Sequence, residues 1–151
     1  MRFQLRLQRP HLWQKPSKSI FPTTDKVTEE RNTLPKNERL CGKKGISQLL
    51  AEGRYGNTSD IRFRYLPDNG KEENRIMISV PKKLFKRAVK RNLLKRRIRE
   101  SYRTQKHLIT SSTKVDIFFM YSTKQIMEYQ DIHDKVKEIL TKINDNLNRK
   151  K

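Results

Sequence analysis

Hydrophobic and polar positions follow a helical period in some segments of this chain and a strand period in others. Ordered structure is expected to begin near Leu34. A short helix from about Lys43 to Gly53 is then predicted by apolar residues that share one helical face: Ile46, Leu49 and Leu50.

Three segments are predicted to be β-strands, and in the first two the apolar and polar residues alternate with the period of a strand. The first two, residues 59–66 and 75–80, are separated by a turn of Pro67, Asp68, Asn69 and Gly70, and we expect them to pair with each other. The third, residues 115–121, is apolar on both faces except at Asp116. We expect a neighbouring helix to satisfy that carboxylate.

A last helix is predicted from apolar residues at intervals of 4, 3, 1, 3 and 4: Ile132, Val136, Ile139, Leu140, Ile143 and Leu147. With a further helix between the second and third strands, the order becomes α-β-β-α-β-α. This order predicts an α/β (α+β) two-layer sandwich, in which helices pack on a small mixed sheet. The expected organisation is a basic extension (residues 1–32), one domain (33–147) and a short basic tail (148–151).

The helix between the second and third strands is strongly basic. The stretch from Lys82 to Arg103 holds eleven Lys or Arg residues and one acid, Glu100. On a helical wheel, basic and amide side chains fall within an arc of about 140°: Arg91, Lys95, Arg99, Asn92 and Arg96. An adjacent arc of apolar residues can dock on a core: Leu94, Ile98 and Tyr102.

The composition of the whole chain agrees with a polyanionic partner. Of 151 residues, 36 are Lys or Arg and 16 are Asp or Glu, so the formal charge is +20. This length suits one domain of about 100 to 120 residues with tails. The single cysteine, Cys41, excludes an internal disulfide and suits a reducing cytoplasm. No apolar run approaches the roughly 20 residues of a membrane span.

The first 32 residues are less informative. They lack the apolar block that a secretory signal requires, and they contain no acid before Asp25. A flexible basic arm is the preferred interpretation, while an organellar transit peptide and a start codon placed too far upstream remain open.

Four short motifs together resemble the protein subunit of bacterial ribonuclease P. They are Ser79-Val80-Pro81-Lys82-Lys83, Ala88-Val89-Lys90-Arg91-Asn92, Lys95-Arg96 and Arg99-Glu100-Ser101-Tyr102. The resemblance extends over about residues 34–144, with 34–53 similar to the first helix of that family, 62–80 to its hairpin and 115–121 to its last strand. It implies a left-handed β-α-β crossover, which is an exception among parallel strand connections.

The resemblance implies a protein that binds a catalytic RNA and the 5′ leader of precursor tRNA. The RNA, with bound Mg²⁺, would cut endonucleolytically to give the mature tRNA 5′ end. The protein would supply no catalytic residue and hold no metal firmly. It would act in the bacterial cytoplasm with one copy per RNA, and neither DNA nor a membrane is an expected partner.

Two groups of residues carry the expected binding. Arginines can hold phosphates bidentately, lysines add point charges, and an asparagine can bind a 2′-hydroxyl. The expected RNA contacts are Arg87, Lys90, Arg91, Asn92, Lys95, Arg96 and Arg99. The expected leader contacts are Lys82, Lys83, Ile46, Leu50 and Tyr65, although Tyr65 and Phe63 share a strand face that also suits the core.

This chain departs from the family pattern at two places. Leu93 stands where the family normally has arginine, so one RNA contact is lost or is taken over by Lys90 or Arg97. Ile46 and Leu50 stand where the family often has aromatic residues. Aliphatic side chains do not stack as rings do, a difference of about 1 kcal/mol or more per base.

No residue pattern predicts catalysis by the protein itself. The three histidines, at positions 11, 107 and 133, are not spaced for joint metal or acid–base work, and the acids form no paired motif. Two other functions stay open. One is a ribosomal-type or general RNA-binding protein. The other is a DNA-binding regulator, which is disfavoured because a strand, not a partner helix, precedes the basic helix.

Overall fold

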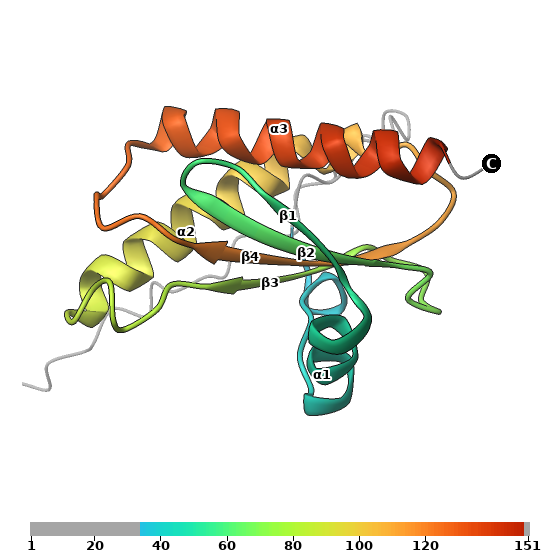
Figure 1. The fold of residues 1–151 in the computed structure, drawn as a ribbon, viewed down its shortest axis with the longest axis horizontal. Coiled ribbons are helices and arrows are strands. Elements are labelled where there is room, and N and C mark those ends of the chain that lie inside the picture. The colour runs from blue at the N-terminus through green and yellow to red at the C-terminus, as the bar shows by residue number, and fades with distance from the viewer. Residues whose placement is uncertain (1–33, 150–151) are drawn as a thin grey trace, which may run out of the picture. The chain divides into compact units, whose positions relative to one another are not determined.

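A four-stranded sheet separates one helix, α1, from two others, α2 and α3, which cover its opposite face (Figure 1). The computed structural model describes residues 34–149, so the expectation for residues 1–32 lies outside the described part. In chain order the elements are η1 (Lys36–Glu38), α1 (Lys43–Glu52), β1 (Arg54–Asn57), β2 (Ile61–Pro67), β3 (Arg75–Ser79), α2 (Ala88–Gln105), η2 (Lys106–Leu108), β4 (Val115–Tyr121) and α3 (Tyr129–Asn148). The predicted α+β sandwich with a mixed sheet is confirmed.

The strands lie in the order β1-β2-β4-β3. β2 pairs with β1 and β4 in antiparallel fashion, and β3 pairs with β4 in parallel. The prediction that residues 75–80 pair with the preceding strand is therefore wrong. The reason lies in β4, whose apolar residues on both faces are best buried at the centre of the sheet. α2 thus crosses between two parallel strands, and the expected left hand of this crossover stays a prediction.

The strand β1 was not predicted. It pairs with β2 through a tight connection in which the Thr58 hydroxyl donates to the carbonyl oxygen of Ile61 at 2.8 Å. Gly56 lies opposite Phe63, and a Cβ at that glycine would fall 2.2 Å from the Phe63 ring. Only glycine leaves room for this ring. The run Asn-Thr-Ser-Asp at residues 57–60 is the turn signal that could have revealed the hairpin.

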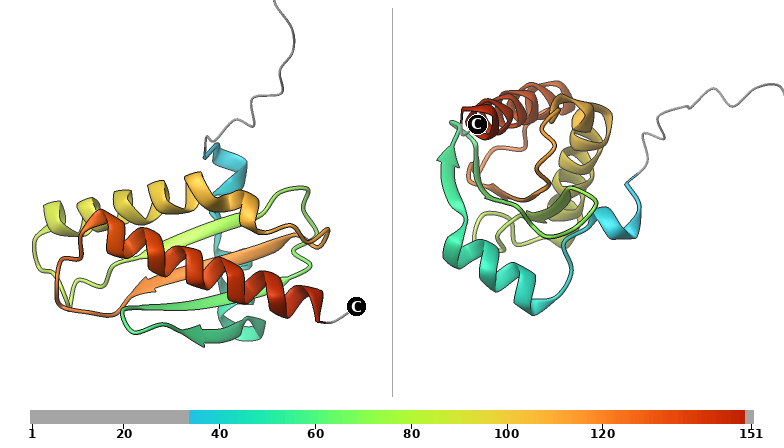
Figure 2. Two further views of the ribbon diagram at one scale, coloured as in Figure 1. Left: turned by 90° about the horizontal axis from the view of Figure 1, so that it is seen from above. Right: turned by 90° about the vertical axis from the view of Figure 1, so that its right-hand side faces the viewer.

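The main core lies between the sheet and the pair α2 and α3, which run side by side above it (Figure 2). The apolar face predicted for α3 is confirmed, because all six residues are buried: Ile132, Val136, Ile139, Leu140, Ile143 and Leu147. A smaller cluster on the other face joins α1 to the sheet through Leu49, Leu40 and Phe118. Gly53 follows the last residue of α1, as expected.

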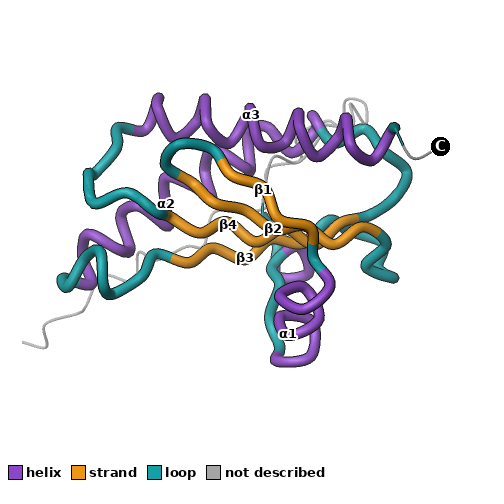
Figure 3. Tube along the Cα trace, viewed as in Figure 1, coloured by secondary structure: helices purple, strands orange, loops and turns teal. Residues whose placement is uncertain are grey.

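The buried carboxylate of Asp116 is held by strand and loop residues, so the expectation of a helix partner is wrong. Arg75 of β3 donates to its two oxygens at 2.8 and 2.6 Å, and the Asn69 amide donates at 2.8 Å. The loop that carries Asn69, residues 68–74, extends past the end of the sheet (Figure 3). Its turn is of the predicted kind, since Asp68 and Gly70 have positive φ of 61° and 62°.

Candidate nucleic-acid interface

The helix α2 rests on the core through one face and turns its basic residues outward. Leu94, Ile98 and Tyr102 are almost fully buried, as the helical wheel predicts. We use the term basic face of α2 for the predicted RNA contacts: Arg87, Lys90, Arg91, Asn92, Lys95, Arg96 and Arg99. Arg91 and Lys95 are half-buried beside the core, whereas the other five side chains are exposed.

Arg91 also makes hydrogen bonds to the loop before α2. Its Nη1 donates to the carbonyl oxygens of Phe85 and Lys86, at 2.8 and 2.6 Å. Phe85 is itself buried, with its ring centroid 5.9 Å from that of Tyr121. These contacts hold the loop before α2 in place, so Arg91 offers RNA fewer donors than an unengaged arginine would.

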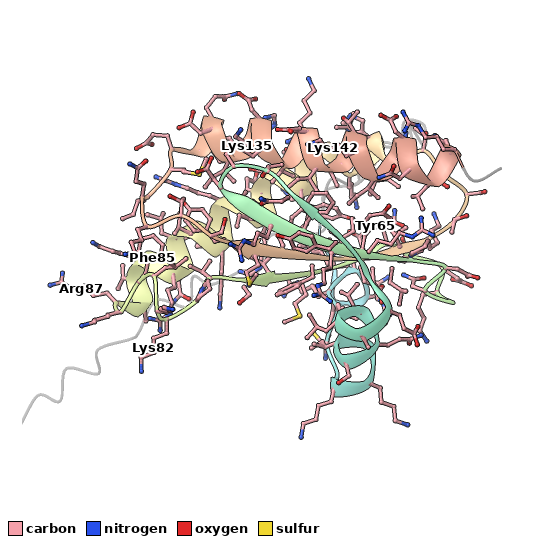
Figure 4. The ribbon with its side chains drawn as sticks, viewed as in Figure 1. Tyr65, Lys82, Phe85, Arg87, Lys135 and Lys142 are labelled. Atoms are coloured by element: carbon pink, nitrogen blue, oxygen red, sulfur yellow. The ribbon has the colours of Figure 1, made fainter. Side chains whose placement is uncertain are left out.

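The loop from β3 to α2 carries further exposed cations. Lys82 and Lys83 are exposed in the turn after Pro81, and Lys82 and Arg87 lie together at one end of the sheet (Figure 4). Because Phe85 anchors this loop, these charges are attached to the folded core. Lys82 and Lys83 therefore extend the cationic surface from the basic face of α2 toward the sheet.

The substitution of leucine at position 93 leaves an apolar residue on the outer side of α2. Leu93 is 38% exposed. Arg97 is not available as a replacement, because it donates to the Met127 carbonyl oxygen and lies 3.7 Å from the Glu128 carboxylate. Lys90, which is exposed, is the remaining candidate to replace the lost contact.

The helix α1 presents Leu50 to solvent beside the sheet face that α2 and α3 leave uncovered, here called the open face. Leu50 is 41% exposed, and the Arg64 guanidinium donates to its carbonyl oxygen. Ile46 is partly buried against the cluster that includes Phe118. Of the two α1 candidates, Leu50 is the more accessible.

Tyr65 does not share a surface with α1. Tyr65 is 3% exposed, and its ring belongs to the core between the sheet and α3 (Figure 4). The strand period places Tyr65 and Phe63 on this side and Arg62 and Arg64 on the other. Tyr65 and Leu50 therefore cannot contact one leader segment together, and the alternative of a core role for Tyr65 fits the structure.

The open face holds candidate residues that sequence reasoning missed. Tyr55 is 58% exposed and pairs across strands with Arg64, so its ring lies on the open face with Arg62. A small hollow is lined by Tyr55, Arg62, Phe63, Arg64, Phe118 and Met120. The alternating arginines of β2 were visible in the sequence, but Tyr55 could be found only with β1.

Acidic residues near the basic face are engaged by neighbouring cations. Arg103 donates to both oxygens of Glu100, and this hydrogen bonding lowers the pKa of the Glu100 carboxyl. Glu38 pairs with Lys106 at 2.8 Å.

Within residues 34–149, no three His, Cys, Asp or Glu side chains gather closely enough to hold a metal ion. In the same part of the chain, no helix is long and apolar enough to span a membrane.

Comparison with known proteins adds independent evidence. The family model described as Ribonuclease P matches residues 34–144. A ribonuclease P protein component from Porphyromonas gingivalis is 30% identical over 121 residues, which cover 76% of this chain and 88% of that protein. One from Dictyoglomus turgidum is 37% identical over 110 residues, covering 73% and 88%. The structure of the Staphylococcus aureus RNase P protein aligns with a TM-score of 0.60 and 25% identity, covering 70% of this chain and 94% of that one.

The fold and its exposed cations define a small α/β protein with a surface suited to polyanions, carried on the helix between two parallel strands. The matches then give the family. This chain belongs to the ribonuclease P protein family. Membership associates it with a ribonuclease P RNA and with tRNA processing, and it does not favour a ribosomal or general RNA-binding role.

Proposed function

We propose that this chain is the non-catalytic subunit of a ribonuclease P in which the RNA performs the cleavage. The observation that carries the proposal is the state of Arg96, Arg99 and Asn92. All three are exposed on a helix seated in the core, and within residues 34–149 none of their side chains has a hydrogen-bond or ion-pair partner. Cations that a fold positions but does not neutralise are suited to a polyanion.

In this proposal the basic face of α2 binds the catalytic RNA. Arg96 and Arg99 hold phosphates with their guanidinium groups, and Asn92, about one turn before Arg96, can bind a 2′-hydroxyl. Arg91 positions the loop before the helix while adding charge, and Lys95 lies beside it. One copy of the protein binds one RNA.

The 5′ leader of precursor tRNA is proposed to lie on the open face, between α1 and the loop that carries Lys82 and Lys83. This face offers what single-stranded RNA requires, namely cations along a groove and apolar or aromatic surfaces for bases. Arg62 supplies charge there, while Leu50 and Tyr55 supply contact area. Tyr55 offers a ring that Ile46 and Leu50 lack.

The proposed division of labour assigns hydrolysis to the RNA and its bound Mg²⁺, in the bacterial cytoplasm. Three acids of the described residues fit this assignment, since Asp116, Glu38 and Glu100 are each paired with a basic residue. Carboxylates held in this way are poor candidates for general acids or bases.

A reconstitution experiment tests the proposal. Protein freed of nucleic acid is added to an in vitro transcribed bacterial ribonuclease P RNA and a precursor tRNA at low Mg²⁺. Cleavage that yields the mature 5′ end should require the RNA and be accelerated by the protein. Cleavage by the protein alone, or RNA activity that the protein leaves unchanged, would refute the proposal.

The leader site has its own test. Tyr55→Ala and Arg62→Ala should weaken holoenzyme binding to a precursor tRNA with a leader, while binding to mature tRNA stays the same. Lys137→Ala, on the exposed side of α3, is the matched control for Arg62. Equal losses for both tRNAs would place the leader elsewhere.

A further inference from the structure

A groove beside the basic face combines two kinds of surface. It has a volume of about 730 Å³ and lies between α2, the segment around η1 and the first turn of α3. Arg39, Arg96 and Arg99 contribute guanidinium groups, and Leu93 and Tyr129 contribute apolar and aromatic surface. This volume falls within the range of sites that bind small ligands, about 300 to 1,000 Å³.

The charge around the groove favours an anion. Five arginines and a single acid, Glu100, line it. Arg103 donates to Glu100, and Arg97 is engaged by the Met127 carbonyl oxygen and Glu128. Arg39 donates to the Leu34 carbonyl oxygen at 3.1 Å. Arg96 and Arg99 are left, within the described part of the chain, with their guanidinium groups unengaged.

The apolar side of the groove favours an aromatic group. Leu93 is 38% and Tyr129 is 36% exposed, and both line the groove, so they offer apolar and aromatic surface to a ligand. The Tyr129 ring is supported by His133, whose ring centroid is 5.8 Å away. The exposed part of the phenol ring lies beside cations in the groove, a combination found in sites that stack single nucleotides.

We infer that this groove binds one unpaired nucleotide of the ribonuclease P RNA. Its base lies against Tyr129 and Leu93, and its flanking phosphates lie on Arg96 and Arg99. A paired helix would use the arginines alone, because its bases are stacked inside the duplex. The inference rests on the proposed function and adds a base-binding site to a surface otherwise described by charge.

The site gives a physical role to leucine at position 93. A long charged side chain there would occupy the groove and replace its apolar wall. With Leu93, the groove keeps space next to Tyr129 and loses one phosphate contact. The affinity gained from contact with the base then compensates for the phosphate contact that is lost at position 93.

Affinity measured against salt separates base contact from phosphate contact. The probe is an in vitro transcribed bacterial ribonuclease P RNA, titrated with the full chain at several salt concentrations. Tyr129→Ala should weaken binding by about 5-fold to 150-fold, the range expected for stacking of one base. The slope of log affinity against log salt should not change, because no charge is removed. Tyr129→Phe should bind like the wild type.

Two further variants serve as controls for this experiment. Ile126→Ala removes a comparably exposed apolar side chain outside the groove and should bind like the wild type. Tyr129→Leu keeps an apolar residue for folding but removes the ring, and it should lose affinity as the alanine variant does. Wild-type affinity in Tyr129→Ala or Tyr129→Leu would overturn the inference. If wild-type protein failed to bind the RNA, the proposed function itself would fail.

A photocrosslink locates the contact directly. With p-benzoylphenylalanine placed at Tyr129, irradiation of the complex should attach the protein to the RNA. Reverse transcription should stop at a nucleotide in a loop or bulge. Stops confined to paired helices, or attachment to protein in place of RNA, would overturn the inference.

Discussion

Arg99 and Arg91 lie on the same basic face, but the structure predicts different effects when each is replaced. Arg99 is exposed and has no partner within residues 34–149, whereas Arg91 donates to the carbonyl oxygens of Phe85 and Lys86. Arg99→Ala should therefore remove one phosphate contact. Arg91→Ala should mainly release the loop before α2.

The expected salt dependence of RNA affinity follows from the number of cations on the basic face of α2. Four cations of the basic face are exposed, and two more are half-buried: Arg87, Lys90, Arg96 and Arg99, then Arg91 and Lys95. With about 0.7 to 0.9 per contact, four to six contacts give a slope of log affinity against log salt between about −2.8 and −5.4. Arg99→Ala should make this slope shallower by about 0.7 to 0.9. Its affinity loss should be about threefold larger at 50 mM salt than at 200 mM.

The assay is a titration of ribonuclease P RNA with each variant at four salt concentrations between those values. Arg91→Ala should lower affinity with a smaller change in slope than Arg99→Ala. Lys137→Ala removes an exposed lysine of α3 and should leave the slope unchanged. The reasoning is refuted if Arg99→Ala has the wild-type slope. It is also refuted if Arg91→Ala flattens the slope as much as Arg99→Ala does.

Three predictions concern stability. Arg75→Ala leaves the Asp116 carboxylate buried without its guanidinium partner, so the free energy of unfolding in urea should fall by about 3 to 5 kcal/mol, and a loss below 1 kcal/mol would contradict this. Gly56→Ala places a Cβ against the Phe63 ring and should lower the free energy of unfolding by about 1 to 3 kcal/mol, and unchanged stability would contradict this. Burial raises the pKa of Tyr102, so above about pH 10 the unfolded chain loses this proton while the folded chain keeps it. The free energy of unfolding should then fall by about 1.4 kcal/mol per pH unit through this group. Tyr102→Phe should remove that part of the pH dependence. Equal pH dependence in the two proteins would count against the prediction.

The sequence by itself determined the elements whose cause is local. Helical spacing of Leu94 and Ile98 was enough to place the buried side of α2 and hence its basic face. The same reasoning located α1, α3 and the strands from Ile61 and Val115, because side-chain direction within one element depends only on its period. The chemistry of exposed arginine and lysine also follows from residue type, so most of the RNA-binding candidates could be named in advance.

Only the tertiary structure decided which elements and side chains meet. β3 pairs with β4 because a strand that is apolar on both faces lowers the free energy most at the centre of the sheet, a property of the whole sheet and not of residues 75–80. The pairing of Arg75 with Asp116 and the depth of Tyr65 depend on this packing in the same way. A local pattern gives the direction in which a side chain points, but the groups that it reaches belong to segments distant in the chain.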